Sequence, residues 1–67
     1  MEIEIGYIIE YSRKKGLFEP YGERQKAFVK PERLIELMRD SFRYVIWSAH
    51  WTNYAEYRVN VGVLPTI

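Results

Sequence analysis

The sequence predicts one small α+β domain over residues 1–67, with element order ββαββ and a mainly antiparallel sheet carrying one helix on one face. Three observations predict this fold. Residues 2–11 alternate apolar and polar side chains with the period of a strand. Residues 31–42 repeat apolar side chains with the period of a helix. Residues 44–51 and 57–64 are rich in β-branched and aromatic residues and flank a short polar break, as in a β-hairpin.

The first predicted strand has one apolar face and one acidic face. Isoleucine and tyrosine occupy its odd positions from Ile3 to Tyr11, whereas three of its even positions are glutamate. The odd face is therefore expected to look into the core. A basic break at residues 12–16 and a Pro–Gly turn at 19–22 follow, and a second strand is expected at 23–29.

The predicted helix begins at Pro31, because proline is favoured at a first helical position. Glu32 adds a negative charge near the positive end of the helix dipole. The apolar positions that define the stripe expected to pack on the sheet are Leu34, Ile35, Leu37, Met38 and Phe42.

The predicted strand 44–51 carries large apolar groups on both faces, which indicates a strand covered on both sides. One helix covers only one face, so a partner chain is the expected second cover. A 67-residue chain has a small core, and small folds often need a staple. Because the chain has no cysteine, disulfides are excluded, and a homodimer or other homo-oligomer is expected.

Composition argues against several other classes of protein. Ten Lys and Arg against nine Asp and Glu give a net charge of +1, which is no strong signal for nucleic-acid binding. No apolar run approaches the ~20 residues that a membrane span needs. The acidic N-terminus lacks the basic flank of a signal peptide, and the absence of cysteine suits the cytoplasm, where the protein is expected.

Catalytic and metal-binding signatures are weak. His50 is the only imidazole. Ser48 shares its face of the predicted strand, but the local sequence contains no acid that could orient the pair. The acids of the helix interleave with arginines, as on a solvated face, and no phosphate loop or zinc spacing is present. The sequence therefore predicts a non-enzyme without cofactor or metal. One alternative is an enzyme subunit in which Ser48 and His50 line a site at a dimer interface.

Aromatic residues crowd the C-terminal third of the chain. Trp47 and either Tyr57 or Tyr44 are expected in the core. One sheet and one helix lack the volume to cover every ring, and exposed Tyr and Trp are typical interface anchors. The leading hypothesis is a protein-binding module that inhibits or regulates a larger protein. Small proteins of phages and mobile elements are the expected type, with a host nucleic-acid-processing or defence enzyme as the target. The residues predicted to contact the partner are Tyr44, His50, Trp51, Tyr54 and Tyr57, with Trp51 and Tyr54 at the hairpin tip.

The alternative function is nucleic-acid binding by the basic loop and the basic side of the helix. Cations would meet phosphates and rings would stack on bases. The residues predicted for this surface are Arg13, Lys14, Lys15, Lys26 and Lys30.

Overall fold

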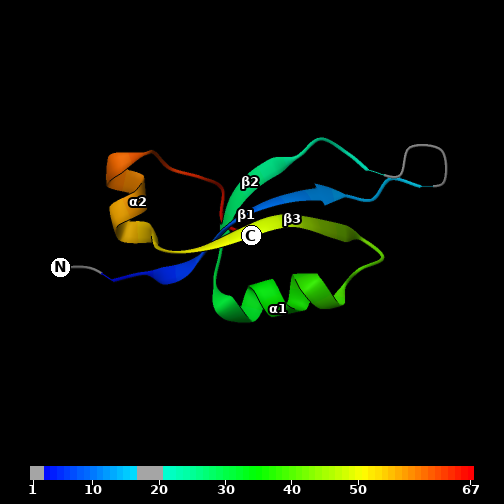
Figure 1. Cartoon of the computed structure of the whole chain (residues 1–67), viewed down its shortest axis with the longest axis horizontal. Helices are drawn as coiled ribbons and strands as arrows, with labels where there is room; N and C mark the ends of the chain where they lie inside the picture. Colours follow the sequence, from blue (N-terminus) through cyan, green and yellow to red (C-terminus); the bar gives the residue numbers. More distant parts are fainter. Residues whose placement is uncertain (1–2, 17–20) are drawn as a thin grey trace.

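The fold was described from a computed structural model, in which residues 3–16 and 21–67 are placed. Figure 1 shows their elements in chain order, which are β1 (Ile5–Arg13), β2 (Gln25–Val29), α1 (Pro31–Arg39), β3 (Tyr44–Asn53) and α2 (Tyr54–Asn60). The structure confirms a small mixed α+β fold with an antiparallel sheet. Its order is ββαβα, so the predicted fourth strand at 57–64 and the hairpin that it would close are wrong.

The sheet has three strands in the order β2-β1-β3, and both pairings are antiparallel. Strand β1 is therefore central and extends to Arg13, further than the predicted strand 2–11, so that part of the predicted basic loop belongs to the sheet. The predicted turn at 19–22 falls partly outside the described residues. A bulge interrupts the β1–β3 ladder, because Glu10 pairs with Ser48 and Tyr11 with Ile46, which leaves Trp47 as the extra residue.

One face of the sheet packs on α1 and forms the main core. Ile9, Ala27 and Val29 are fully buried there, and Leu34 and Leu37 of α1 lie against them. This arrangement follows the predicted odd face of β1. Ile3, which the alternation also placed inside, is 73% exposed because it precedes the first paired residue of the sheet.

Helix α1 begins at Pro31 as predicted and ends three residues earlier than expected. The amide of Asp40, its C-terminal cap, donates to the carbonyls of Glu36 and Leu37, and a turn follows. Phe42 is consequently outside the helix and 90% exposed. Only part of the predicted apolar stripe is buried, since Ile35 and Met38 are 51% and 62% exposed.

The opposite face of the sheet has a second, smaller core at one end. The ring of Phe28 lies over Gly6. A side chain there would clash with the backbone carbonyl of Val29 and meet the Phe28 ring at 2.6 Å, so this position requires glycine. The ring of Tyr54 stacks on the other side of Phe28, at 4.3 Å between centroids and 11° between planes. Helix α2 therefore covers part of the face for which the sequence suggested a partner chain.

The segment predicted as the last strand is helical because Asn53 starts a helix. Its side chain accepts a hydrogen bond from the amide of Ala55 and another from the amide of Glu4, 49 residues away. Gly62, with φ of 141°, follows the end of α2 in a conformation that glycine tolerates. The alternating Val59, Val61 and Val63 are exposed and have no strand beside them.

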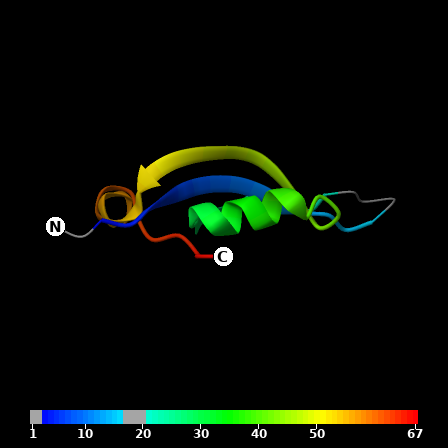
Figure 2. The ribbon, with the colours of Figure 1, turned by 90° about the horizontal axis from the view of Figure 1, so that it is seen from below.

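The C-terminal tail returns from α2 to the outer edge of β2. The Phe28 amide donates to the Pro65 carbonyl at 2.9 Å, and the Ile67 amide donates to the Phe28 carbonyl at 3.2 Å. The side chain of Ile67 then packs against the α1 core. In Figure 2 the end of the tail lies on the same side of the arched sheet as α1. The tail thus closes the edge of β2 at Phe28.

The molecule is long and thin, with extents of 47 × 21 × 15 Å. Its radius of gyration is 12.9 Å, whereas a globular chain of this length has about 11 Å. One sheet layer with one helix along it leaves much of the chain near the surface (Figures 1 and 2).

Candidate functional site

The outer edge of β3 is the largest open backbone surface that the described part of the sheet presents. Strand β3 pairs with β1 on one side, and the described residues place no strand on its other side. The edge of β2, by contrast, has the C-terminal tail as a neighbour at Phe28. An open edge is a row of unpaired N–H and C=O groups that accepts another strand.

The hydrogen bonds show which backbone groups of β3 point outward. The amide of Tyr54 donates to the carbonyl of Glu4 at 2.7 Å, so this pair is of the hydrogen-bonded kind. The two kinds of pair alternate along an antiparallel ladder. In the β1–β3 register, Ala49 and Trp51 therefore occupy non-hydrogen-bonded pairs with β1. Their backbone N–H and C=O groups consequently point away from the sheet.

The side chains of this edge are uncharged and partly apolar. From Tyr44 to Asn53 the strand contains no Asp, Glu, Lys or Arg, although 28% of the whole chain is charged. Ala49, His50 and Trp51 are exposed, and the Trp51 side chain reaches 65%. Edge strands that avoid partners usually carry charges or proline, and this strand has neither.

The chain exposes more surface than a compact monomer. Its accessible surface is 5204 Å², whereas folded monomers of this mass expose about 4,500 Å². The excess of roughly 700 Å² follows from the elongated shape of the molecule.

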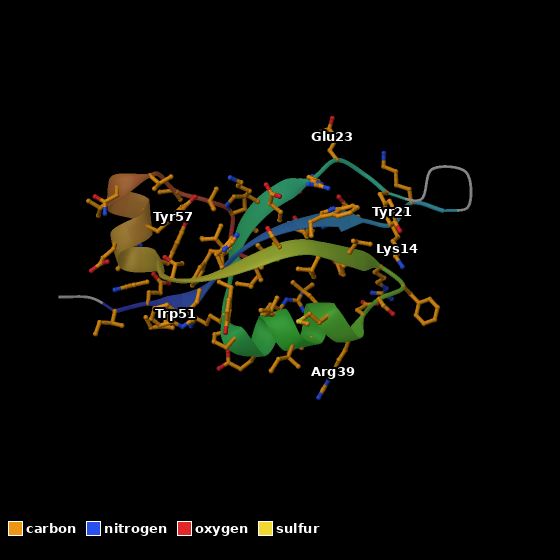
Figure 3. The ribbon with its side chains drawn as sticks, in the orientation of Figure 1. Lys14, Tyr21, Glu23, Arg39, Trp51 and Tyr57 are labelled. Atoms are coloured by element: carbon orange, nitrogen blue, oxygen red, sulfur yellow. The ribbon has the colours of Figure 1, made fainter. Side chains whose placement is uncertain are left out.

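The residues predicted to contact a partner occupy different environments. Figure 3 shows Trp51 and Tyr57 on separate elements, β3 and α2. Trp51 and His50 are exposed on the open edge. Tyr54 is 4% exposed within the second core, and Tyr57 stacks on it at 5.9 Å. Tyr44 is half-buried and packs edge-on against Tyr11, so the structure brings only two of the five residues to an exposed surface.

Tyr54 has a structural role that its predicted position at a hairpin tip did not suggest. Its hydroxyl accepts from the Leu64 amide at 2.7 Å and donates to the Leu64 carbonyl at 2.9 Å. The same side chain therefore stacks on Phe28 and holds the C-terminal tail.

Trp47 lies on the open face of the sheet instead of the core, because the bulge turns its side chain there. Its indole N–H donates to the hydroxyl of the buried Ser12 at 2.8 Å. The Arg24 guanidinium lies 4.2 Å from its ring centroid, and Tyr21 contacts it edge-on. Trp47 is 40% exposed and lies at the centre of a surface cluster. The cluster also includes the Glu10–Arg24 ion pair, at 3.9 Å.

Ser48 and His50 share the open face, as the sequence predicted, and Glu10 lies directly across from Ser48. The pattern within β3 gave no sign of this acid, which comes from β1. These side chains border a shallow hollow of about 170 Å³. No hydrogen bond joins the three among the described contacts, so they lack the relay that an activated serine requires.

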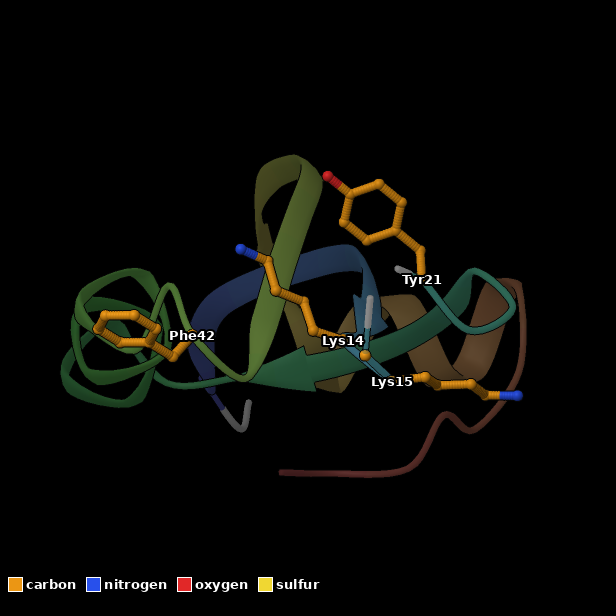
Figure 4. Close-up of a pocket in the computed structure, with 5 residues that line it drawn as sticks. Lys14, Lys15, Tyr21 and Phe42 are labelled. Carbon is orange, nitrogen blue, oxygen red and sulfur yellow. The ribbon is translucent and has the colours of Figure 1, made fainter. Parts of the chain in front are cut away.

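The basic residues of the nucleic-acid hypothesis are spread over the molecule. Arg13, Lys14 and Lys15 lie at one end, Lys26 lies across from Glu10 in the sheet, and Lys30 precedes α1. An open cleft of about 410 Å³ lies beside Lys14, Lys15, Gly16, Tyr21 and Phe42. In Figure 4 the side chains of Lys15 and Phe42 point in opposite directions, so these two groups do not converge on the cleft.

Two further searches of residues 3–16 and 21–67 give negative results. No cluster of three or more His, Asp or Glu side chains could hold a metal ion there. Neither described helix has the length and apolar character that crossing a membrane requires.

Comparison with known proteins gives no relative for this chain: no protein-family model, curated protein or solved structure matches it.

Proposed function

We propose that this protein is a non-enzymatic protein-binding module that accepts a strand of another polypeptide at the outer edge of β3. In this role it acts as a small inhibitor or regulator. The observation that carries the proposal is the ten-residue, uncharged, open edge with Trp51 65% exposed on it. Main-chain hydrogen bonds would supply affinity, and side-chain contacts beside the strand would supply specificity.

Trp51 is the side chain best suited to anchor a partner. Tryptophan is enriched among the few interface residues that carry most of the binding energy. Its neighbour Ala49 on the same face is small and exposed, which leaves room beside the indole for a side chain of the incoming strand.

The lack of a reactive constellation supports a binding role over catalysis. His50 and Ser48 have no hydrogen-bonded acid among the described residues, and the hollow beside them is small and open. A general base has to lie within hydrogen-bond reach of an oriented group.

The test begins with affinity capture from the native host, followed by titration of the purified partner. Trp51→Ala is expected to weaken binding by about 10-fold or more, as for an interface anchor. Val59→Ala serves as the matched control, because Val59 is an 82% exposed apolar residue on α2. Equal affinity for the wild type, Trp51→Ala and Val59→Ala would place the binding surface elsewhere and refute the proposal.

A second pair of variants tests the strand itself. Ala49→Pro removes a backbone N–H that points out of the sheet, whereas Ala49→Ser keeps it. We expect partner binding to be lost with proline and retained with serine. Retention with both would exclude strand addition.

A further inference from the structure

We propose that the edge of β3 binds a second copy of this chain, forming a two-fold symmetric dimer with a continuous six-stranded sheet. In this dimer, residues 48–52 of the two copies pair antiparallel, with the axis at His50. The inference rests on the proposed function, because it concerns the same edge of β3. It names the strand of a second copy as the first one to bind there. A strand from a larger target would have to displace the second copy.

The chemistry of the strand suits self-pairing. A two-fold axis places each side chain of the edge beside residues from the same short segment, so a charged strand would bring like charges together. Strand β3 contains no Asp, Glu, Lys or Arg. Its segment 48–52 also lies beyond the bulge at Trp47, where the ladder to β1 is regular.

The direction of the backbone hydrogen-bonding groups and the sizes of the side chains both favour an axis at His50. It pairs Ala49 with the partner's Trp51, and both residues have their N–H and C=O groups pointing outward. The smallest side chain of the segment then lies beside the largest. Both are exposed in the single chain, so each has room for the other.

Two helices flank the edge of β3. In Figure 1 helix α2 turns toward the β2 side of the sheet, whereas α1 lies on the β3 side in this view. Helix α1 lies along β3 on one face (Figures 1 and 2), and a two-fold axis perpendicular to the sheet puts both α1 helices on that face. Ile35 and Met38, the half-exposed apolar residues of α1, are expected to lose exposure there.

The elongated chain has surface available for such a contact, since it exposes roughly 700 Å² more than a typical monomer of this mass. The second edge of the sheet does not compete for the second copy at Phe28, because the C-terminal tail already pairs with β2 there.

The first experiment measures solution mass by sedimentation equilibrium over a concentration series. The wild type and Ala49→Ser are expected to reach twice the 8.1 kDa of one chain. Ala49→Pro is expected to dissociate at least about 30-fold more readily, because symmetry removes the outward N–H from both copies. Circular dichroism checks folding, and a synthetic chain with an N-methyl group on Ala49 replaces the proline variant if that variant is unfolded.

The second experiment locates the axis. The chain has no cysteine, so His50→Cys introduces a single thiol. In the proposed register this thiol faces its own copy across a non-hydrogen-bonded pair, within the Cα separation that a disulfide spans. Mild oxidation is expected to give a covalent dimer for His50→Cys and not for Glu56→Cys, a control on the exposed side of α2.

Two results would overturn the inference. One is a wild type that stays monomeric up to about 1 mM, where even an association of about −4 kcal/mol is visible. The other is a dimer that survives Ala49→Pro unchanged. A monomeric wild type whose edge still binds a captured partner would refute self-pairing alone, whereas a dimer that binds no other protein would refute regulation of a larger target.

Discussion

The hydroxyl of Tyr54 offers a test of how the second core is held together. Tyr54→Phe deletes one oxygen and keeps the ring that stacks on Phe28. Two hydrogen bonds with Leu64 disappear, each with a net value of about 0.5–1.5 kcal/mol. Because Leu64 is only partly buried, water can replace some of the loss. We expect the free energy of unfolding to fall by about 1–2 kcal/mol.

The assay is urea and thermal unfolding at one fixed protein concentration, since any self-association makes the midpoint depend on concentration. For a domain of this size the expected loss lowers the melting temperature by roughly 4–16 °C. Amide exchange at Leu64 is expected to accelerate, because the tail opens locally when its anchor is removed.

Tyr57→Phe is the matched control. Tyr57 belongs to the same ring stack, and no hydrogen bond of its hydroxyl is found within the described residues. Its removal is expected to change stability by less than about 0.5 kcal/mol, as for a site away from special features. If the two variants unfold alike and Leu64 exchanges at the wild-type rate in both, the tail is not held by the Tyr54 hydroxyl.

Three other predictions concern the backbone and the charge. Gly6→Ala is expected to destabilise the fold by about 3 kcal/mol in urea unfolding, because its methyl group would meet the Phe28 ring at 2.6 Å; Gly22→Ala, with no contact nearer than 3.4 Å, should cost far less. Asn53→Ala is expected to cost about 1–2 kcal/mol by the same measurement, because the cap of α2 and a tie to Glu4 are both lost; an unchanged midpoint would exclude that role. In gel-shift titrations with DNA and RNA we expect no salt-dependent binding, since the basic residues do not converge, and steep salt dependence would revive that function.

Local patterns predicted the elements whose own side-chain pattern is regular. The alternation in β1 and the proline at the start of α1 report local geometry, and both elements are present near the predicted positions. The predicted apolar stripe of α1 includes a residue that lies outside the helix. Phe42 fits the helical period, but the chain leaves the helix at Asp40, so the ring is exposed.

The error at residues 57–64 has a physical cause that no local window contains. The valines at 59, 61 and 63 alternate as in a strand, but β1 already has a neighbour on each side. Asn53 is held by the amide of Glu4, which fixes a helix start where a turn was expected. This bond joins residues 49 positions apart, so the pattern of the segment alone could not reveal it.

The candidate site could be predicted only in part for the same reason. The sequence showed that β3 is rich in aromatic residues of the kind found at interfaces. It could not show that β3 would be an outer strand of the sheet. That position depends on β1 pairing with both β2 and β3, and on the tail returning to β2. The bulge that moves Trp47 out of the expected core also appears only when two distant strands are aligned.

The tail beside β2 also bears on how far assembly can proceed. A sheet with two accessible sides can grow without limit, since each added molecule presents a fresh acceptor for the next. Here the segment Pro65–Ile67 already occupies both the backbone N–H and the C=O of Phe28, so in the proposed dimer a further molecule cannot pair with β2 at that residue as long as the segment stays in place. Loosening this segment is expected to let the proposed dimer polymerise. Light scattering of Tyr54→Phe over time, measured together with its unfolding curve, tests this expectation.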